Sequence, residues 1–599
     1  MPSIQRVSFM ALAGLSLASV VAWAGPAAPF REAYSTEPRL TRPPGPSCAV
    51  PLFTDHAFGE TGDPKAMTAT PLTFDYQPPK ACDGPWAKVV LEMDVSVPAG
   101  KQYDRTASIW LGGTAIYFGT TQEPSADVGA RWHVERDLTD YAALFRGARP
   151  GQAIVNNWLS DRYTSAITAS ARLVFYPAGA VAPAVAPADA VYPLSDDPRG
   201  AATVVQDGAQ RLHGSLTLPR NVTRAYLDVI AQSQGNDEPW YTCIDDADVT
   251  RTQHFALESP YDGAPLQECG GGNLRQVLVA IDGQSAGLAP VYPWTYTGGV
   301  DPNLWRPIPD IQTLNFTPYR VDLTPFAGVL DDGRPHDVSV RVLGANRFFN
   351  LAASLLIYQD HDARVVTGKV LANSLATQTD LGTPRVDSAL RETRDHRVEG
   401  HVDTTRHDHY RILGEITTSR GTIRSEVSQT ASFANRQTFT RPDAPTWHQL
   451  IDQSTQVDDT TTTHVGDGPE TRQRRTLTYP LRLDVIKHVA DDGSFRGEID
   501  MSQGLVSVRQ RQRDGHDVFD SHLDIAMHSH DEADFNRMGS AITHPRDQHA
   551  VQTLSFKDSL GSCLTMHVAS QKGQDAVLKQ GQGCLGALNL LNWRSRPSP

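Results

Sequence analysis

Apolar and polar residues alternate in many short segments of the chain. Clear examples lie at residues 89–97, 277–281, 338–342 and 481–485. Alternation with a period of two residues is typical of half-buried strands in antiparallel sheets. Turn pairs such as Asp282-Gly283 and Asp492-Gly493 punctuate these segments, whereas segments with helical periodicity are scarce. The pattern therefore predicts an all-β protein made of β-sandwiches or jelly rolls.

Changes in composition along the chain predict three β domains. An Ala/Pro-rich segment at 177–193 is expected to be an extended linker. It separates a first jelly-roll or β-sandwich domain at 46–180 from a second one at 194–360, and we expect the two to pack together. After residue 365, Thr, Asp, Arg and His become more frequent and aromatic residues fewer. This change predicts a further antiparallel β domain at 365–599, with an elongated, solvent-washed sheet.

The N-terminus has the features of a signal peptide. Arg6 precedes an almost wholly apolar run at 7–22, and Ala22-Trp23-Ala24 forms a small-x-small cleavage site. We therefore expect a signal peptide at 1–24 and a secreted or periplasmic mature protein. No other apolar run is long enough to cross a bilayer, so we expect no membrane span. We also expect a monomer.

The cysteines are compatible with export. They form three pairs that are close in the sequence: Cys48 with Cys82, Cys243 with Cys269, and Cys563 with Cys584. An even number of cysteines in an exported protein predicts disulfide bonds. Six cysteines allow many connectivities, so the pairing stays open. The formal net charge of −14 argues against a nucleic-acid-binding surface, because phosphate binding requires a basic patch.

The first candidate for chemistry is Asp104, which lies at the start of a predicted strand and next to Arg105. In isolation such a pair is most simply explained as a structural ion pair. A carboxylate at the end of a strand, at the rim of a sandwich, is also well placed to serve as a catalytic base. Arg105 is expected to lower the pKa of Asp104 and to keep it ionised in acid.

Two later segments combine acids or turn residues with flat aromatic side chains. Residues 235–241 place Asp237 and Glu238 shortly before two aromatic residues, and residues 292–308 are dense in Trp, Tyr, Gly and Pro. Aromatic faces can bind sugar rings, and neighbouring acids can bind hydroxyl groups or donate a proton. A polar turn followed by core aromatic residues, and a loop that closes the end of a sandwich, are the structural alternatives.

Together with three further blocks, these segments resemble the peptide:N-glycosidase A family, in a bacterial, acidic type. The blocks are Asp-Arg with Trp-Leu-Gly-Gly at 104–113, Thr-Gln-Glu-Pro at 121–124, Trp-x-Val-Glu-x-Asp-x-Thr-x-Tyr at 132–141, Asp-Glu-Pro-Trp-Tyr at 237–241, and Gly-Gly-Val-x-Pro-x-Leu-Trp-Arg-Pro-Ile at 298–308. Pro239 and Val300 depart from the family's Phe and Ile. The resemblance covers about residues 46–360. It implies an amidase that cleaves the bond between N-acetylglucosamine and asparagine in N-glycosylated peptides and glycoproteins, without a metal or organic cofactor.

A weaker likeness to the peptide:N-glycosidase F enzymes, which are two packed jelly rolls, places their essential aspartate at Asp104. Their second acid falls at Asn156, where the acid is missing, and their third has Glu238 as its best counterpart, with Glu268 behind it. The resemblances thus imply catalytic roles for Asp104, Glu238 and Arg105. They imply substrate contacts for Asp237, Trp240, Tyr241, Glu268, Arg275, Trp294, Trp305, Arg306 and Asn156.

This interpretation requires Asp104 and the turn around Glu238 to converge on one groove between the two sandwiches. Asp104 would position or activate a water molecule, and Glu238 would act as an acid or base or anchor a sugar. The acidic charge balance is compatible with activity at low pH. Two other functions stay open: a non-catalytic secreted carbohydrate-binding protein, and a glycosidase that acts through the same two acids.

Two further motifs have structural explanations. Residues 283–287 satisfy the Gly-x-Ser-x-Gly pattern, but Pro290 and Pro293 follow instead of a helix, which predicts a turn between strands. The segments 407–409 and 528–530 each place two imidazoles on one face of a strand, a spacing that can bind a metal. In a chain with 20 His, we expect these to be surface histidines.

Overall fold

The described part of the chain consists mainly of β-strands, which confirms the predicted all-β class. The structure is a computed structural model, and it describes residues 30–597 apart from 38, 61–68, 126, 181, 183–185, 246–271, 393–397, 441–445, 537–546 and 574–575. The predicted signal peptide at 1–24 lies outside these residues. Within them the single α-helix is α2 (Ala327–Leu330), and no helix has the length and apolar character needed to span a bilayer.

The first sandwich is a jelly roll. Eight of its strands form the sheets β2-β9-β4-β7 and β3-β8-β5-β6, and β1 adds to the first sheet beside β7. Both sheets contribute to one hydrophobic core. The elements are β1 (Phe30–Glu32), β2 (Cys48–Phe58), β3 (Leu72–Tyr76), β4 (Trp86–Val97), β5 (Thr106–Leu111), β6 (Thr114–Thr120), β7 (Gly129–Asp137), the 3-10 helix η1 (Thr139–Arg146), β8 (Arg149–Val155) and β9 (Ile167–Pro177).

The second sandwich repeats this topology. Its sheets follow the orders β11-β18-β13-β16 and β12-β17-β14-β15, and β10 pairs with another stretch of β18. The elements are β10 (Ala190–Pro193), β11 (Thr203–Asp207), β12 (Leu212–Thr217), β13 (Val222–Ser233), η2 (Gly235–Asp237), η3 (Trp240–Thr242), β14 (Gln276–Ile281), β15 (Gln284–Pro290), η4 (Pro302–Trp305), β16 (Tyr319–Asp322), η5 (Thr324–Phe326), α2, β17 (Pro335–Leu343) and β18 (Asn346–Gln359).

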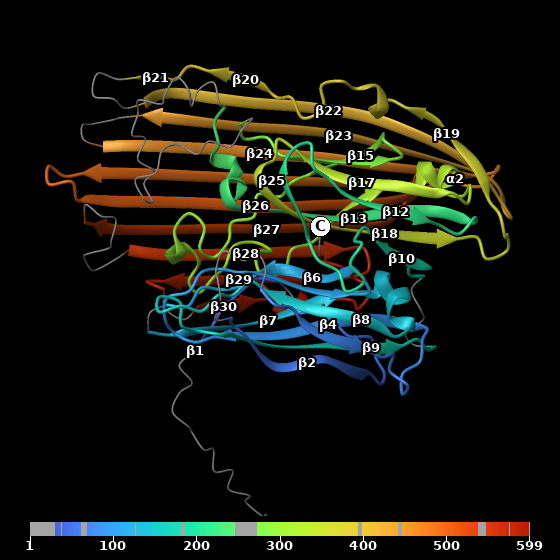
Figure 1. The fold of residues 1–599 in the computed structure, drawn as a ribbon, viewed down its shortest axis with the longest axis horizontal. Coiled ribbons are helices and arrows are strands. Elements are labelled where there is room, and N and C mark those ends of the chain that lie inside the picture. The colour runs from blue at the N-terminus through green and yellow to red at the C-terminus, as the bar shows by residue number, and fades with distance from the viewer. Residues whose placement is uncertain are drawn as a thin grey trace, which may run out of the picture.

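The C-terminal part of the chain, from β19 onward, forms a twelve-stranded antiparallel sheet. Its long strands follow the long axis of the molecule, and the first jelly roll lies below them in the view of Figure 1. The elements are β19 (Thr367–Asn373), η6 (Leu375–Thr377), β20 (Arg385–Ser388), β21 (Arg391–Glu392), β22 (Val398–Thr418), β23 (Gly421–Thr440), β24 (Thr446–Val465), β25 (Thr471–Val489), β26 (Phe495–Arg513), β27 (His516–Phe535), β28 (Asp547–Asp558), β29 (Cys563–Gln571), β30 (Val577–Gln580) and η7 (Leu585–Ala587).

One face of this sheet packs on the second jelly roll, and the two share a hydrophobic core. Buried amide side chains of the sheet donate hydrogen bonds to backbone carbonyls of the jelly roll. Gln437 reaches the carbonyl of Cys243 at 2.8 Å, and Gln552 reaches that of Pro309 at 3.2 Å. The sheet that we expected to be washed by solvent is therefore covered on one of its faces. Sequence polarity hides this, because amide side chains form part of the covered contact surface. The proposed domain boundaries stay a prediction.

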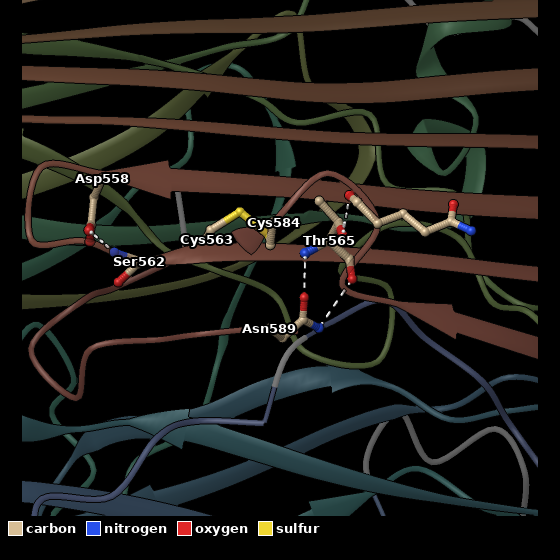
Figure 2. The surroundings of a disulfide bond; sticks show 7 residues. Asp558, Ser562, Cys563, Thr565, Cys584 and Asn589 are labelled. Atoms are coloured by element: carbon tan, nitrogen blue, oxygen red, sulfur yellow. Dashed lines mark hydrogen bonds between the residues drawn. A yellow bond between two sulfur atoms is a disulfide. The ribbon is translucent and has the colours of Figure 1, made fainter. Parts of the chain in front are cut away.

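Two of the sequence-local cysteine pairs form disulfide bonds, Cys48–Cys82 and Cys563–Cys584. Figure 2 shows the second, beside which the Asn589 side chain exchanges hydrogen bonds with the backbone of Thr565. The bond thus joins the last segment of the chain to β29. The predicted partner of Cys243, Cys269, lies outside the described residues.

The segment at 177–193 differs from the expected linker. Strand β9 ends at Pro177, and the last four residues of the segment form β10, which pairs with β18. The segment is extended there because it is part of a sheet, not because it spans a gap between domains. The two jelly rolls are packed against each other, and the Tyr117 hydroxyl of the first donates to the Leu314 carbonyl of the second at 2.7 Å.

Candidate active site

Three carboxyl groups converge where the two jelly rolls meet. Asp104 lies two residues before β5 and Glu123 follows β6, both in the first jelly roll, whereas Glu238 follows η2 in the second. Glu123 Oε1 accepts a hydrogen bond from the Asp104 backbone N–H at 3.1 Å. Asp104 and Glu123 both act electrostatically on Glu238. The structure therefore brings Asp104 and the turn around Glu238 together, as the sequence predicts.

The backbone of the loop at 292–308 closes one side of this cluster. The N–H of Gly298 donates to the Asp104 carboxylate. A Cβ atom at this position would lie 2.5 Å from Glu123 Oε1 and 2.7 Å from Asp104 Oδ1. Only glycine therefore lets the loop approach both acids this closely. Asp104 and Glu238 are themselves half-buried, so solvent reaches the cluster.

Burial of three like charges shifts their pKa values upward. Burial raises the pKa of Asp104 to about 6, although Arg105 and hydrogen bonds to the carboxylate oppose the shift. Burial and the Asp104 charge raise the pKa of Glu123 to about 8, against the effect of Arg306. Burial and the charges of Asp104 and Glu123 raise the pKa of Glu238 to about 8. Near neutral pH the cluster therefore holds an ionised Asp104 beside protonated acids, which suits it to general acid–base chemistry.

The same residues match a known family. The family model described as "Peptide N-acetyl-beta-D-glucosaminyl asparaginase amidase A" matches residues 38–375, a range that contains both jelly rolls and all three acids. The chain belongs to this family.

A curated relative supports this assignment. The peptide-N4-(N-acetyl-beta-glucosaminyl)asparagine amidase A of Prunus dulcis is 29% identical over 344 residues, which cover 54% of this chain and 56% of the relative. The chain thus spans about half the length of the curated relative that it matches.

Solved structures of two other proteins are also similar. Recombinant PNGase F has a TM-score of 0.33 at 14% identity, with coverage of 52% of this chain and 96% of that chain. PNGF-II has a TM-score of 0.33 at 11% identity, with coverage of 53% and 66%.

Arg105 differs from its expected effect. It does lower the pKa of Asp104, but burial is the larger influence, so the expectation of an acid that stays ionised at low pH is wrong. Its guanidinium donates instead to Gln102 at 3.0 Å and to Asn157 at 3.4 Å. No ion pair among the described residues joins it to Asp104. The main contacts of Arg105 thus fix the backbone next to Asp104, and its effect on the Asp104 charge is the smaller one.

Asp237 and Arg275, which the sequence predicts to contact the substrate, have fully buried side chains in this structure. Arg275 donates to Asp237 Oδ1 from Nε and Nη2, and the backbone N–H of Asn346 donates to Asp237 Oδ2. This pair ties the turn that carries Glu238 to β14 and β18. The two residues therefore fix the position of the turn without being part of the exposed surface of the site.

The aromatic residues predicted to bind sugars are part of the core. The four are 0 to 4% exposed: Trp240, Tyr241, Trp294 and Trp305. Trp294 stacks on Phe316 with ring centroids 4.2 Å apart, and Trp305 donates to the Gly299 carbonyl. The local sequence does not reveal their burial, because the C-terminal sheet, which lies far along the chain, shares a core with the second jelly roll. Their burial is the arrangement that the structural alternative describes, and their predicted substrate contacts stay a prediction.

Two other aromatic residues lie next to Asp104 and Arg105, and one of them is exposed while the other is half-buried. Tyr103 is 42% exposed, and its ring centroid lies 4.3 Å from that of Tyr163. The Arg105 guanidinium carbon lies 5.0 Å from the Tyr103 centroid and 5.7 Å from that of Tyr163. Sequence reasoning missed this pair, since residues 60 positions apart give no local signal.

Glu123 is the acid that the predicted site lacks, although its Thr-Gln-Glu-Pro block carries part of the family resemblance. Arg306, a predicted substrate contact, donates from Nη2 to Glu123 Oε2 at 3.1 Å, and its side chain is 24% exposed. Arg306 therefore lines the site as an ion-pair partner of Glu123. Asp104 precedes β5 and the block follows its paired strand β6, so both lie at the same end of this hairpin. That spacing is the signal that could have identified Glu123.

The remaining predicted residues have separate outcomes. Asn156 is half-buried and accepts a hydrogen bond from the Ala69 backbone N–H at 3.2 Å, while Glu268 lies outside the described residues. The Gly-x-Ser-x-Gly segment begins in the turn between β14 and β15, which confirms the expected turn. Asn156 thus adds no acid to the cluster, and no nucleophile elbow forms at this turn.

Proposed function

We propose that the protein is a peptide-N4-(N-acetyl-β-glucosaminyl)asparagine amidase that releases N-glycans from glycopeptides and glycoproteins. The observation that carries this proposal is the cluster of Asp104, Glu123 and Glu238, built from both jelly rolls of the region that matches the family model. The printed name of the Prunus dulcis relative supports the same substrate class.

Hydrolysis of this amide requires a base for the attacking water and an acid for the departing nitrogen. Ionised Asp104 takes a proton from the water as its oxygen attacks the side-chain carbonyl. Protonated Glu238 then donates a proton to the nitrogen, so that a glycosylamine leaves and an aspartate remains in the peptide. Near neutral pH the order of the pKa values, about 6 for Asp104 and about 8 for Glu238, provides both protonation states at once.

The surroundings of the cluster suit the rest of the substrate. Tyr103 and Tyr163 offer aromatic surface directly beside Asp104, where the first sugar is expected to pack. Arg105 directly follows Asp104 in the chain and Arg306 pairs with Glu123, so both guanidinium groups can stabilise negative charge that develops on the carbonyl oxygen. We propose that the protein acts on N-glycosylated peptides as a secreted or periplasmic enzyme, which the disulfide bonds Cys48–Cys82 and Cys563–Cys584 support.

The decisive experiment incubates the protein with a defined N-glycopeptide in H2(18)O and analyses both products by mass spectrometry. An amidase converts the glycosylated asparagine to aspartate carrying one 18O and releases an intact glycan. Asparagine that retains one sugar would indicate a glycosidase, and an unchanged glycopeptide would indicate a binding protein; either result contradicts the proposal.

Asp104→Asn is the test of the site. It should lower kcat/KM by at least about 100-fold, because it removes the base while preserving the shape of the side chain. Asp524→Asn, at an exposed position on β27, serves as the matched control and should release glycan at the wild-type rate. Equal thermal unfolding of the two variants would show that the loss is chemical. Full activity of Asp104→Asn would remove Asp104 from the mechanism.

A further inference from the structure

A row of ionisable side chains crosses three neighbouring strands of the C-terminal sheet. Asp500 on β26 pairs with His530 on β27, and His530 pairs with His549 on β28. Directly paired residues of an antiparallel sheet project from the same face. The three side chains therefore stand side by side, on strands that are adjacent in Figure 1.

This row lies on the face of the sheet that points away from the second jelly roll. On the same three strands, residues of the opposite parity reach the jelly roll: Gln503 donates to the Pro293 carbonyl, Ser529 to that of Leu304 and Gln548 to that of Asn303. Side chains alternate between faces along a strand. The row is thus separated from the amide interface by the thickness of the sheet.

The geometry of this group suits metal coordination. Ligating atoms of Glu498, Asp500 and His530 all lie within 4.8 Å of one another. His530 Nδ1 lies 3.2 Å from Asp500 Oδ1, and His528 Nε2 lies 3.7 Å from the same oxygen. The ring of His549 stacks on that of His530 at a centroid distance of 4.8 Å. Two carboxylates and one imidazole therefore lie close enough to share one ion, and the imidazoles of His528 and His549 are their neighbours.

We propose that Glu498, Asp500 and His530 form a binding site for a divalent transition-metal ion such as Zn²⁺, with His549 as a further ligand. Imidazole with carboxylate is a donor set that Zn²⁺ accepts in a four-coordinate site. Ca²⁺ and Mg²⁺ prefer oxygen ligands alone, so the imidazoles favour a transition metal over either of them.

The other His-x-His segment provides an internal comparison. His407 and His409 project from β22 with the same spacing, and both are exposed. Their Nδ1 atoms contact the hydroxyls of Ser432 and Thr430 at 3.1 Å and 3.2 Å, on the paired strand β23. A hydroxyl is a far weaker zinc ligand than a carboxylate, so this segment lacks the second half of a site. Of the two segments with this spacing, only 528–530 thus contributes to a candidate metal site.

The test is a titration of the untagged full-length chain with ZnCl2 after removal of bound metal by a chelator. Isothermal calorimetry should give saturable binding with one high-affinity ion per chain, and Zn²⁺ should raise the unfolding temperature. His530→Gln should weaken binding by at least about 10-fold, as expected for loss of a ligand. His409→Gln is the matched control and should bind as the wild type does.

Asp500→Asn is a second variant, for the case that His530→Gln fails to fold. It is less disruptive because the Asp500 side chain is 43% exposed, whereas that of His530 is 11% exposed. This variant should fold normally, lose the high-affinity step and show no thermal stabilisation by Zn²⁺. The proposal would be overturned if the wild type bound no stoichiometric Zn²⁺, or if a folded Asp500→Asn or His530→Gln variant bound it unchanged. These readouts are independent of amidase activity, so either proposal can fail without the other.

Discussion

The junction of the two jelly rolls contains two clusters of ionisable side chains. In one the carboxyl groups lie next to other carboxyl groups, and in the other they lie next to arginines. The first is the acidic cluster of Asp104, Glu123 and Glu238, whose pKa values burial and mutual repulsion raise. The second is an ion network of Asp140, Asp228, Arg320 and Arg596. Arg320 pairs with Asp228 at 2.7 Å and with Asp140 at 2.9 Å, and Arg596 pairs with Asp140 at 2.8 Å.

The network shows what the same interface does when opposite charges meet. Burial acts to raise the pKa of Asp140, but Arg596 and Arg320 together hold it well below the usual range. The network joins the first jelly roll, the second jelly roll and the C-terminus, so its electrostatic energy contributes to folding. In the acidic cluster Arg105 and Arg306 do not offset burial. A buried group of like charges that persists in this way marks a functional site more than a structural one.

The largest effect should come from breaking the ion network. Arg320→Leu leaves two buried carboxylates with fewer partners and should destabilise the protein by about 3–5 kcal/mol, measured by urea and thermal unfolding. Arg334→Leu is the matched control, since Arg334 pairs with Asp332 but its side chain is 79% exposed. That substitution should leave the stability close to that of the wild type, because solvent screens the exposed pair. Equal effects of the two substitutions would show that the network does not lock the jelly rolls.

Glu238→Gln should have a smaller effect than Arg320→Leu, and it should raise the stability of the protein at high pH instead of lowering it. It should lower kcat/KM by about 100-fold or more, because the proton donor is lost. The raised pKa of Glu238 means that its contribution to stability is present below the pKa of the unfolded chain and is lost as pH rises through about 8.

The unfolding temperature of Glu238→Gln should therefore match that of the wild type near pH 4 and exceed it above pH 8. Asp140→Asn should behave in the opposite way and be less stable than the wild type at neutral pH, since the pKa of Asp140 is lowered. Thermal unfolding of the three proteins across this pH range distinguishes the clusters. A Glu238→Gln variant that is less stable than the wild type at high pH would contradict the electrostatic account of the site.

The smallest effect is a shift in the pH–rate profile. The kcat/KM of the wild type should rise through about pH 6, as Asp104 ionises, and fall through about pH 8, as the protonated acids lose their protons. The pH range of activity predicted from these pKa values, about 6 to 8, is higher than the low pH suggested by the acidic charge balance of the chain.

Glu123→Gln should move the alkaline limb of the profile to lower pH, because the Glu123 charge is one cause of the raised Glu238 pKa. Initial rates of glycan release, measured from pH 4 to 10 with one glycopeptide, provide this test. An unchanged alkaline limb in Glu123→Gln would show that the two acids do not act on each other.

Much of the fold follows from local pattern. Period-two alternation and turn pairs identify strands such as β4, β14 and β17, because the face that a strand side chain occupies depends on its position in the sequence alone. The start of β5 likewise marks Asp104 as an acid at a strand end. The family motifs add Glu238, which no local pattern connects to Asp104.

Burial and electrostatics depend instead on contacts between distant segments. Trp240 and Trp294 look like sugar platforms in sequence, but the C-terminal sheet and the loop before β16 cover them. The amides Gln437 and Gln552 look like surface residues, yet backbone carbonyls of the second jelly roll accept their hydrogen bonds. Polarity predicts exposure only when no partner is available to satisfy the group.

The sequence by itself thus determined the strands, the two jelly rolls and two of the three acids, since these depend on residue order and on motifs. Only the tertiary structure placed Glu123 beside Asp104, turned the predicted platform residues into core, and aligned Asp500, His530 and His549 on three strands. The physical reason is that a pKa, an exposed face and a ligand set each depend on what surrounds a side chain, and residues far apart in the sequence provide those surroundings.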